Sequence, residues 1–508
     1  MRALLVTAFI CGSAGVNAAP NEPAHDHPPP EKLGTVHFDT SCAAAVQSQF
    51  DHAVALLHSF AYDAAAREFH AIAARDEGCA MAHWGVAMSG FHQLWSPPGT
   101  KELDLGREEL LAARRSAART ERERELIAAA AVYFSDSDPG HHATRAKEYE
   151  RAMQSVARHF PSDDEVQVFY ALALIATAPP TDRSHANQKQ AAAILEPIYH
   201  RQPDHPGVAH YLIHAYDSTE LASLGLPAAR AYAKIAPSAP HALHMPSHIF
   251  TRLGLWDDSI RSNEAARRVA HEQGDVGEEL HAMDYLTYAY LQRDRTADAE
   301  RVVEQLHRMG SMLGNDFKIG YAATAMPARL AIERRRWNDA AALEPLAGSA
   351  PHVAAIAYWA RALGNSRSGH ADLADADVAR IDACQAESRS RGDDYWARQT
   401  GVLSKEARAW SENAKGHADD AVSLLKAAAD AEDGLEKLPV TPGPIVPARE
   451  QLGGLLLDLH RPDEALRELT RALQDAPGRQ AGLEAAVRAA EAAGDRAAAA
   501  TFRKLLAT

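Results

Sequence analysis

Apolar and polar residues follow the spacing of amphipathic helices through most of the 508-residue chain. The pattern is clear from Ser48 to Ser89, where apolar positions three and four apart lie on both sides of a short turn at Phe60. Residues at this spacing share one face of a helix, so the stretch predicts a helical hairpin. Comparable pairs of periodic segments continue to the C-terminus. We therefore expect an all-α chain of roughly nine hairpins with no substantial sheet.

Two consecutive helical segments carry a repeated set of prolines and histidines. Three residue pairs are each 34 positions apart: Pro206 and Pro240, His210 and His244, and His214 and His248. This is the period of the tetratricopeptide repeat (TPR), a helix-turn-helix that stacks on its neighbours. The chain resembles exported bacterial TPR proteins, strongly over 48–95, 203–273 and 448–508. The resemblance implies a right-handed α-solenoid with a concave groove that binds its ligands.

The pattern and the resemblance together divide the chain into seven parts. These are a signal peptide at 1–19, a flexible leader with prolines and histidines at 20–40, N-terminal helical repeats at 41–200, His-rich repeats at 201–310, middle repeats at 311–433, a Pro- and Gly-rich loop at 434–447, and C-terminal repeats at 448–508.

The first residues indicate export. Arg2 precedes an apolar run to Ile10, and small residues end at Ala18 and Ala19, as in a cleavable secretory signal. The run is too short to span a bilayer, and no later segment has the pattern of a transmembrane helix. We expect a periplasmic or secreted protein with no membrane anchor in the mature chain.

Three cysteines remain after the signal: Cys42, Cys79 and Cys384. In an oxidising compartment Cys42 and Cys79 could form a disulfide that fixes the N-terminal segment to the first repeat. Two buried thiols are the alternative. Cys384 lies on a helical pattern and is expected to be a small core residue.

The charge balance argues against nucleic acid as a partner. The formal net charge is −15, whereas binding to phosphates needs a dense positive surface. We expect a small molecule or a peptide in the groove, or a protein partner in the cell envelope.

Six histidines are the candidate metal ligands. The repeat register implied by the resemblance places them at groove-lining positions of three successive repeats: His210, His214, His241, His244, His248 and His281. Independently of the family, histidines four apart lie one turn above each other, and two such pairs on helices about 8–10 Å apart would share one space. Imidazole suits transition metals, so we expect copper or zinc. The alternative is a set of buried histidines that hydrogen-bond one another and nearby tyrosines.

Pro246 lies between two of these histidines and affects the argument. A proline inside a helix removes a backbone hydrogen bond and kinks the chain, which would re-aim His248 relative to His244. Alternatively, Pro246 marks a late helix start, and the spacing argument for His244 would fail. The alignment of Pro240 with Pro206 favours a longer, kinked helix.

Other residues are candidates for chemistry in the groove. Asp284 and Tyr288 fall in the same register as His281 and could act as acid or base. Substrate contacts are expected from Arg252, Arg449 and Glu450. Three functions follow: metal-dependent chemistry on a small substrate, as an oxidoreductase or hydrolase; a scaffold that docks a partner; or a metal chaperone or store.

Overall fold

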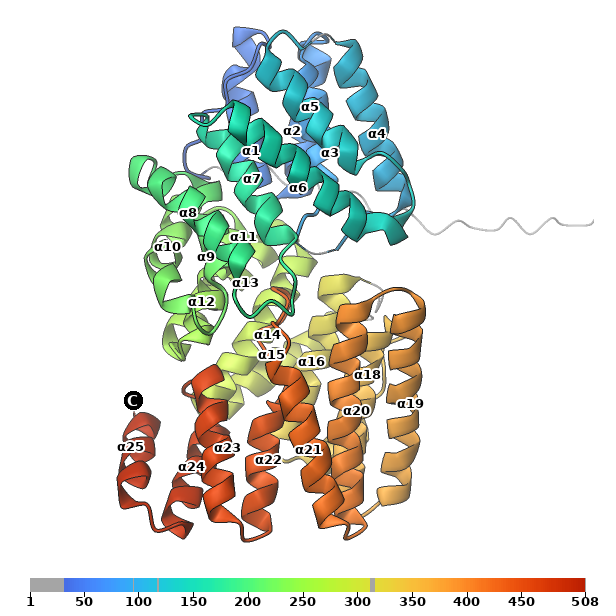
Figure 1. Cartoon of the computed structure of the whole chain (residues 1–508), viewed down its shortest axis with the longest axis vertical. Coiled ribbons are helices and arrows are strands. Elements are labelled where there is room, and N and C mark those ends of the chain that lie inside the picture. Colours follow the sequence, from blue (N-terminus) through green and yellow to red (C-terminus); the bar gives the residue numbers. More distant parts are fainter. Residues whose placement is uncertain (1–31, 95, 117, 311–315, 508) are drawn as a thin grey trace, which may run out of the picture.

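The computed structural model describes residues 32–94, 96–116, 118–310 and 316–507. Within these residues every regular element is a helix, and successive helices pack as antiparallel pairs (Figure 1). The all-α solenoid of TPR-like hairpins expected from the sequence is therefore confirmed. The signal peptide and most of the predicted leader lie outside the described residues.

The N-terminal part contains seven α-helices and two one-turn 3-10 helices. They are η1 (Ala44–Val46), α1 (Gln47–His58), α2 (Tyr62–Arg75), α3 (Ala80–Ser89), α4 (Thr100–Arg115), α5 (Glu121–Tyr133), η2 (Pro139–His141), α6 (His142–His159) and α7 (Asp164–Ala176).

The histidine-rich repeats lie in the middle of the molecule. Their helices are α8 (Ala186–Arg201), α9 (Pro206–Tyr216), α10 (Ala222–Ile235), α11 (Pro240–His244), α12 (Pro246–Arg252), α13 (Trp256–Gln273), α14 (Val276–Gln292) and α15 (Thr296–Arg308).

The C-terminal part completes the array. Its helices are α16 (Phe317–Glu333), α17 (Trp337–Ala341), α18 (Pro351–Arg367), α19 (Ala371–Ser390), α20 (Asp394–Ala414), α21 (Ala418–Asp433), α22 (Ala448–Asp458), α23 (Pro462–Asp475), α24 (Gln480–Ala492) and α25 (Arg496–Leu506).

Local sequence sets the helix that carries the first two histidines. Pro206 occupies the first turn of α9, where its missing N–H costs nothing. His205 caps the helix, because its Nδ1 accepts the Val208 N–H at 3.2 Å. The apolar residues of α9 are buried on all sides, so its histidines face the interior whichever way they point.

Residues 33–38 differ from the expected flexible leader. Leu33, Val36 and Phe38 are buried, and the Thr35 N–H donates to the Asp204 carbonyl at 3.0 Å. The leader is polar overall, but these three side chains are apolar. Their burial stabilises the position of residues 33–38. The leader boundary placed at residue 40 is therefore too late.

Cys42 and Cys79 form a disulfide, while Cys384 is a buried free thiol. The bond joins the segment before η1 to the start of α3. No helix among the described residues is long and apolar enough to cross a membrane.

The loop from 434 to 447, which we call the strap, links α21 to α22 across the inner side of the array. It is held by the Glu436 N–H on the Pro180 carbonyl (2.8 Å), the Leu438 N–H on Tyr395 Oη (3.1 Å), and Tyr285 Oη on the Thr441 carbonyl (3.1 Å). These partners come from three parts of the chain far apart in sequence. The strap therefore connects the α7–α8 loop, α14 and α20.

The C-terminal repeats return to the middle of the molecule and pack on α14. Trp256 Nε1 donates to the Gly478 carbonyl at 2.8 Å, and the Gln480 N–H donates to Gln292 at 3.0 Å. A Cβ on Gly254 would lie 2.6 Å from the Pro477 carbonyl oxygen, so only glycine permits this approach. The solenoid thus closes on itself around the strap.

Candidate metal centre

All six candidate histidines are buried, with exposed fractions of 0–6 %. They come from four helices that meet in the middle of the chain: His210 and His214 on α9, His241 and His244 on α11, His248 on α12, and His281 on α14. Burying an imidazole costs free energy unless its ring nitrogens have partners, so the partners of each ring nitrogen are described in turn.

The helix bearing three of these histidines is kinked at Pro246. Met245 keeps right-handed helical angles (φ −52°, ψ −37°), and its N–H donates to the His241 carbonyl at 2.9 Å. Pro246 then interrupts the ladder, and α12 continues. The kinked helix expected from the sequence is therefore present, and the alternative of a late start is wrong.

The structure divides the rings into two groups. The first histidine group contains His210, His214 and His241, and the second contains His244, His248 and His281. Within each group, one ring nitrogen from every residue lies within 4.8 Å of the others. The sequence predicted one shared space, whereas the structure makes two adjoining ones.

The first histidine group converges on the Nε2 atom of His210. His214 Nε2 and His241 Nε2 each lie 3.1 Å from it. Phe60 covers the group, with its ring centroid 4.4 Å from that of His210.

The second histidine group repeats this geometry. His244 Nε2 lies 3.0 Å from His248 Nε2, and the His281 ring centroid is 4.2 Å from that of His244. The groups adjoin, because the rings of His214 and His248 are 6.0 Å apart and those of His241 and His244 are 6.2 Å apart. Six imidazoles therefore form one contiguous cluster with two centres.

The outer nitrogens fix the protonation of the first histidine group. His210 Nδ1 lies 2.7 Å from the carbonyl oxygen of His58, which can only accept, so Nδ1 carries the hydrogen. His241 Nδ1 faces Glu278 at 3.3 Å. Burial opposes ionisation of Glu278, but the ammonium group of Lys318 holds its pKa well below its usual range, so it too accepts.

The outer nitrogens of the second histidine group are fixed in the same way. His244 Nδ1 lies 2.6 Å from Asn263 Oδ1, and the Asn263 amide donates to the Ser259 carbonyl, which settles its orientation. His248 Nδ1 lies 2.8 Å from Asp217 Oδ2. Burial opposes ionisation of Asp217, but Lys437 and Arg252 hold its pKa well below its usual range.

In each histidine group, the lone pairs of two Nε2 atoms consequently face each other. A neutral imidazole with hydrogen on Nδ1 has a lone pair on Nε2, so His210 faces His241 and His244 faces His248 without a hydrogen between them. Such contacts at 3.0–3.1 Å repel unless a cation lies between the nitrogens. Ligands of a tetrahedral ion with metal–nitrogen bonds of 2.0–2.1 Å are roughly 3.3 Å apart, close to this spacing.

A proton is poorly suited to that position. Burial is the main cause that lowers the pKa of His248 to about 4, and it holds the pKa of His210, His214, His244 and His281 well below the ordinary value for histidine. Neutral rings are the form that binds transition metals. Each histidine group could therefore hold a metal ion.

Tyr285 lies beside the second histidine group. Its ring centroid is 4.7 Å from that of His244, and its hydroxyl lies 3.4 Å from His248 Nε2 while donating to the strap. Tyr285 is one helical turn from His281, so the i,i+4 rule that singled out the histidines could have found it.

The proposed acid–base residues lie elsewhere. Asp284 is rotated away from His281 around α14 and faces Arg329, with Nε and Oδ1 4.0 Å apart. Tyr288 shares the face of His281 but is two turns along, about 10 Å, and packs on Trp256. Burial raises the pKa of Asp284 to about 6 against the lowering effect of Arg329. The structure therefore does not bring either residue to the histidines.

The proposed substrate-binding residues all have partners within the chain. Arg252 binds Asp217, the carboxylate that also accepts from His248. Arg449 binds Asp433 on the far side of the strap, and Glu450 accepts from Arg479 at 2.7 Å. Only Arg252 belongs to the surroundings of the histidine groups, as a support for Asp217.

A third group of potential ligands was missed at the sequence level. Glu165 accepts from His58 Nε2 at 2.9 Å and from His205 Nε2 at 2.8 Å, and the other nitrogens of these rings contact Tyr211 Oη and the Val208 N–H. Every hydrogen then has an acceptor without a metal. No periodic spacing joins these residues, because three separate hairpins supply them.

Comparison with known proteins adds little beyond the fold. No protein-family model and no curated protein matches the chain. Similar solved structures include the human IFIT1 dimer with m7Gppp-AAAA (10% identity, 84% of this chain and 89% of that chain, TM-score 0.36). Another is the APC/C hetero-tetramer Cut9-Hcn1 (10% identity, 89% and 77%, TM-score 0.37). At such TM-scores the likeness carries no argument about function.

Proposed function

We propose that the chain binds two transition-metal ions, one in each histidine group. One observation carries this proposal. The Nε2 atoms of His210 and His241, and those of His244 and His248, lie 3.0–3.1 Å apart although the ring hydrogens are on the Nδ1 atoms. Asp217 and Glu278 supply negative charge behind the two groups, as carboxylates commonly do behind metal-bound histidines.

Three protein ligands per ion leave one coordination position open. This count is typical of catalytic sites, whereas structural zinc has four protein ligands. The donor set holds only imidazoles and no thiolate, which suits copper or zinc. The proposed activity is metal-dependent chemistry on a small substrate, oxidative with copper or hydrolytic with zinc.

The setting we propose is the periplasm or the exterior of the cell. The Cys42–Cys79 disulfide is compatible with an oxidising compartment. A scaffold that docks a partner in the cell envelope is the alternative, and it requires no metal in either histidine group.

Elemental analysis of untagged protein tests the proposal directly. We expect two equivalents of metal per chain. Replacing His244 and His248 together with Ala should reduce this to about one, because the first histidine group stays intact. Spectroscopy of the loaded protein then distinguishes copper from zinc, and assays with oxygen and phenols or with ester and peptide panels distinguish catalysis from storage.

The control is His205→Gln, which removes a ring from the hydrogen-bonded Glu165 group. It should keep both equivalents. Metal content that is equal in the wild type and the double Ala variant, with helicity unchanged by circular dichroism, would contradict the proposal.

A further inference from the structure

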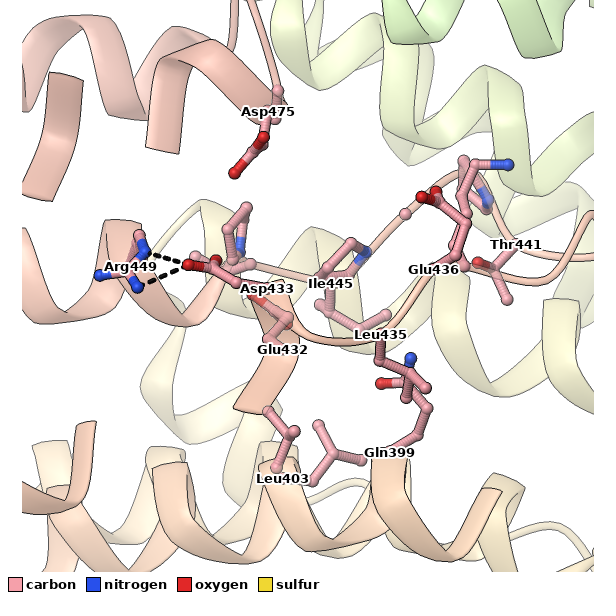
Figure 2. Close-up of a pocket in the computed structure, with 18 of the residues that line it drawn as sticks. Gln399, Leu403, Glu432, Asp433, Leu435, Glu436, Thr441, Ile445, Arg449 and Asp475 are labelled. Atoms are coloured by element: carbon pink, nitrogen blue, oxygen red, sulfur yellow. Dashed lines mark hydrogen bonds and ion pairs between the residues drawn. The ribbon is translucent and has the colours of Figure 1, made fainter. Parts of the chain in front are cut away.

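A second candidate site lies apart from the histidine groups, in a cavity between the strap and the inner ends of α18, α20 and α21. Figure 2 shows its two sides: Gln399 and Leu403 of α20 on one, and Leu435, Thr441 and Ile445 of the strap on the other. The carboxylates of Glu432, Asp433, Glu436 and Asp475 are arranged around it.

Most of the cavity wall is aromatic or aliphatic. Five Tyr and Trp side chains line it, Tyr288, Tyr321, Trp359, Tyr395 and Trp396, together with aliphatic side chains from α18, α20 and the strap. Small-molecule sites typically combine such apolar walls with a few convergent polar groups. The wall therefore suits the apolar body of a ligand.

Two buried polar atoms on this cavity have no hydrogen-bond partner among the described residues. They are His352 Nε2 and Thr400 Oγ1. Their residues are at most 8 % exposed. The carboxyl group of Glu406 also lies on the cavity, where it is hydrogen-bonded by Trp359 and Gln451. Buried polar atoms are nearly always paired in folded proteins, so two on one cavity indicate a surface that receives a polar ligand group.

The charges that remain free on the cavity are negative. Arg449 is bound by Asp433, and Arg252 and Lys437 are bound by Asp217. By contrast, no ion pair joins a basic side chain to Glu406, Glu432 or Asp475 in the described part of the chain. A bound ligand would therefore meet acceptors for a cation rather than donors for an anion.

We infer that this cavity binds an organic amine in its protonated form. The ammonium group lies against the carboxyl groups of Glu406 and Glu432, and the apolar body lies among the rings of Tyr288, Tyr321 and Trp396. Aromatic faces attract cations as well as apolar surface, so one wall serves both ends of such a molecule. The inference does not depend on the metal centre.

The surroundings of Glu432 give amine binding a pH dependence. Burial raises the pKa of Glu432 to about 7, against the Ala448 N–H and Arg479, which lower it, and with Asp433 and Asp475, which raise it further. Burial and the neighbouring Glu432 also raise the pKa of Glu406. Since the ammonium ion binds the ionised form of Glu432, affinity should increase as the pH rises from 6 to 8.

Three probes with the same body and different charge test the inference. Phenethylamine, phenethyl alcohol and 3-phenylpropionate are titrated into the full mature protein at pH 8 by calorimetry. We expect the amine to bind at least tenfold tighter than the alcohol or the carboxylate. E406Q/E432Q should weaken amine binding at least tenfold, and W396L at least fivefold.

The matched control is E468Q. Glu468 is a carboxylate bound to Arg449 outside the cavity, and its loss should change amine affinity less than twofold. Equal binding of the alcohol or the carboxylate, no binding of any probe, or full amine affinity in a folded E406Q/E432Q protein would overturn the inference. If the double variant does not fold, E406Q and W396L alone decide it.

Discussion

Asp217 is the residue at which the second histidine group and the strap meet. Its carboxylate accepts from His248 Nδ1, Arg252 and Lys437, and it is almost fully buried. Three donors hold it in one orientation. The His248 ring is therefore fixed both in its hydrogen position and in its direction.

Asp217→Asn should weaken metal binding by about tenfold, since a neutral amide no longer raises the basicity of His248. Competition with a chelator of known affinity measures the change. Asp377→Asn, which alters a buried carboxylate bound to Arg361 and Arg380 far from the histidines, is the control. An equal loss of affinity in both variants would mean that the effect comes from general loosening of the fold.

At the scale of helices, the chain is largely readable from its sequence because helical periodicity and the 34-residue repeat are local signals. They placed the histidine-bearing helices and the kink at Pro246. They could not show that His241 faces α9 whereas His244 and His248 face α14, because this depends on how three hairpins stack. The path of the strap is equally non-local, since its partners lie as far as 256 residues before it in sequence.

The Cys42–Cys79 disulfide also acts at the scale of helices, since it fixes an irregular segment to the start of α3. Replacing Cys42 and Cys79 together with Ser should lower the free energy of unfolding by about 2–4 kcal/mol, because the bond closes a separation of 37 residues in the unfolded chain. Denaturant melts measure this. Metal content should stay unchanged, because neither residue belongs to the histidine-bearing helices.

Cys384→Ser is the matched control, as it replaces a thiol that forms no disulfide. It should leave the response to reducing agent as in the wild type. A double Ser variant as stable as the wild type would show that packing of Leu33, Val36 and Phe38 alone holds the N-terminal segment.

At the scale of the whole molecule, a buried ion triad holds the array closed. Arg479 binds Glu450 at 2.7 Å and Glu333 at 3.2 Å, and all three side chains are at most 8 % exposed. It joins the C-terminal repeats to α16, beside the contacts of Trp256 and Gln292. The solenoid therefore has long-range contacts in addition to the neighbour contacts expected of a repeat array.

Arg479→Ala should destabilise the protein by about 3–5 kcal/mol, because it leaves the buried carboxylates of Glu450 and Glu333 without their positive partner. Hydrogen exchange should show faster opening of both α14 and α24. Arg503→Ala, which breaks an exposed pair with Glu491, should change stability by less than about 1 kcal/mol. Unchanged protection of α14 in the Arg479 variant would contradict a closed array.

The strap also has a consequence for how the two sites can vary independently. One short loop forms a wall of the carboxyl-lined cavity and, through Lys437, reaches the carboxylate behind His248. A substitution that reshapes the strap for a different ligand would also move Lys437. It would thereby change the charge around Asp217 and His248. Engineering of the cavity is best directed at residues of α18 and α20, which are separate from the partners of the histidines.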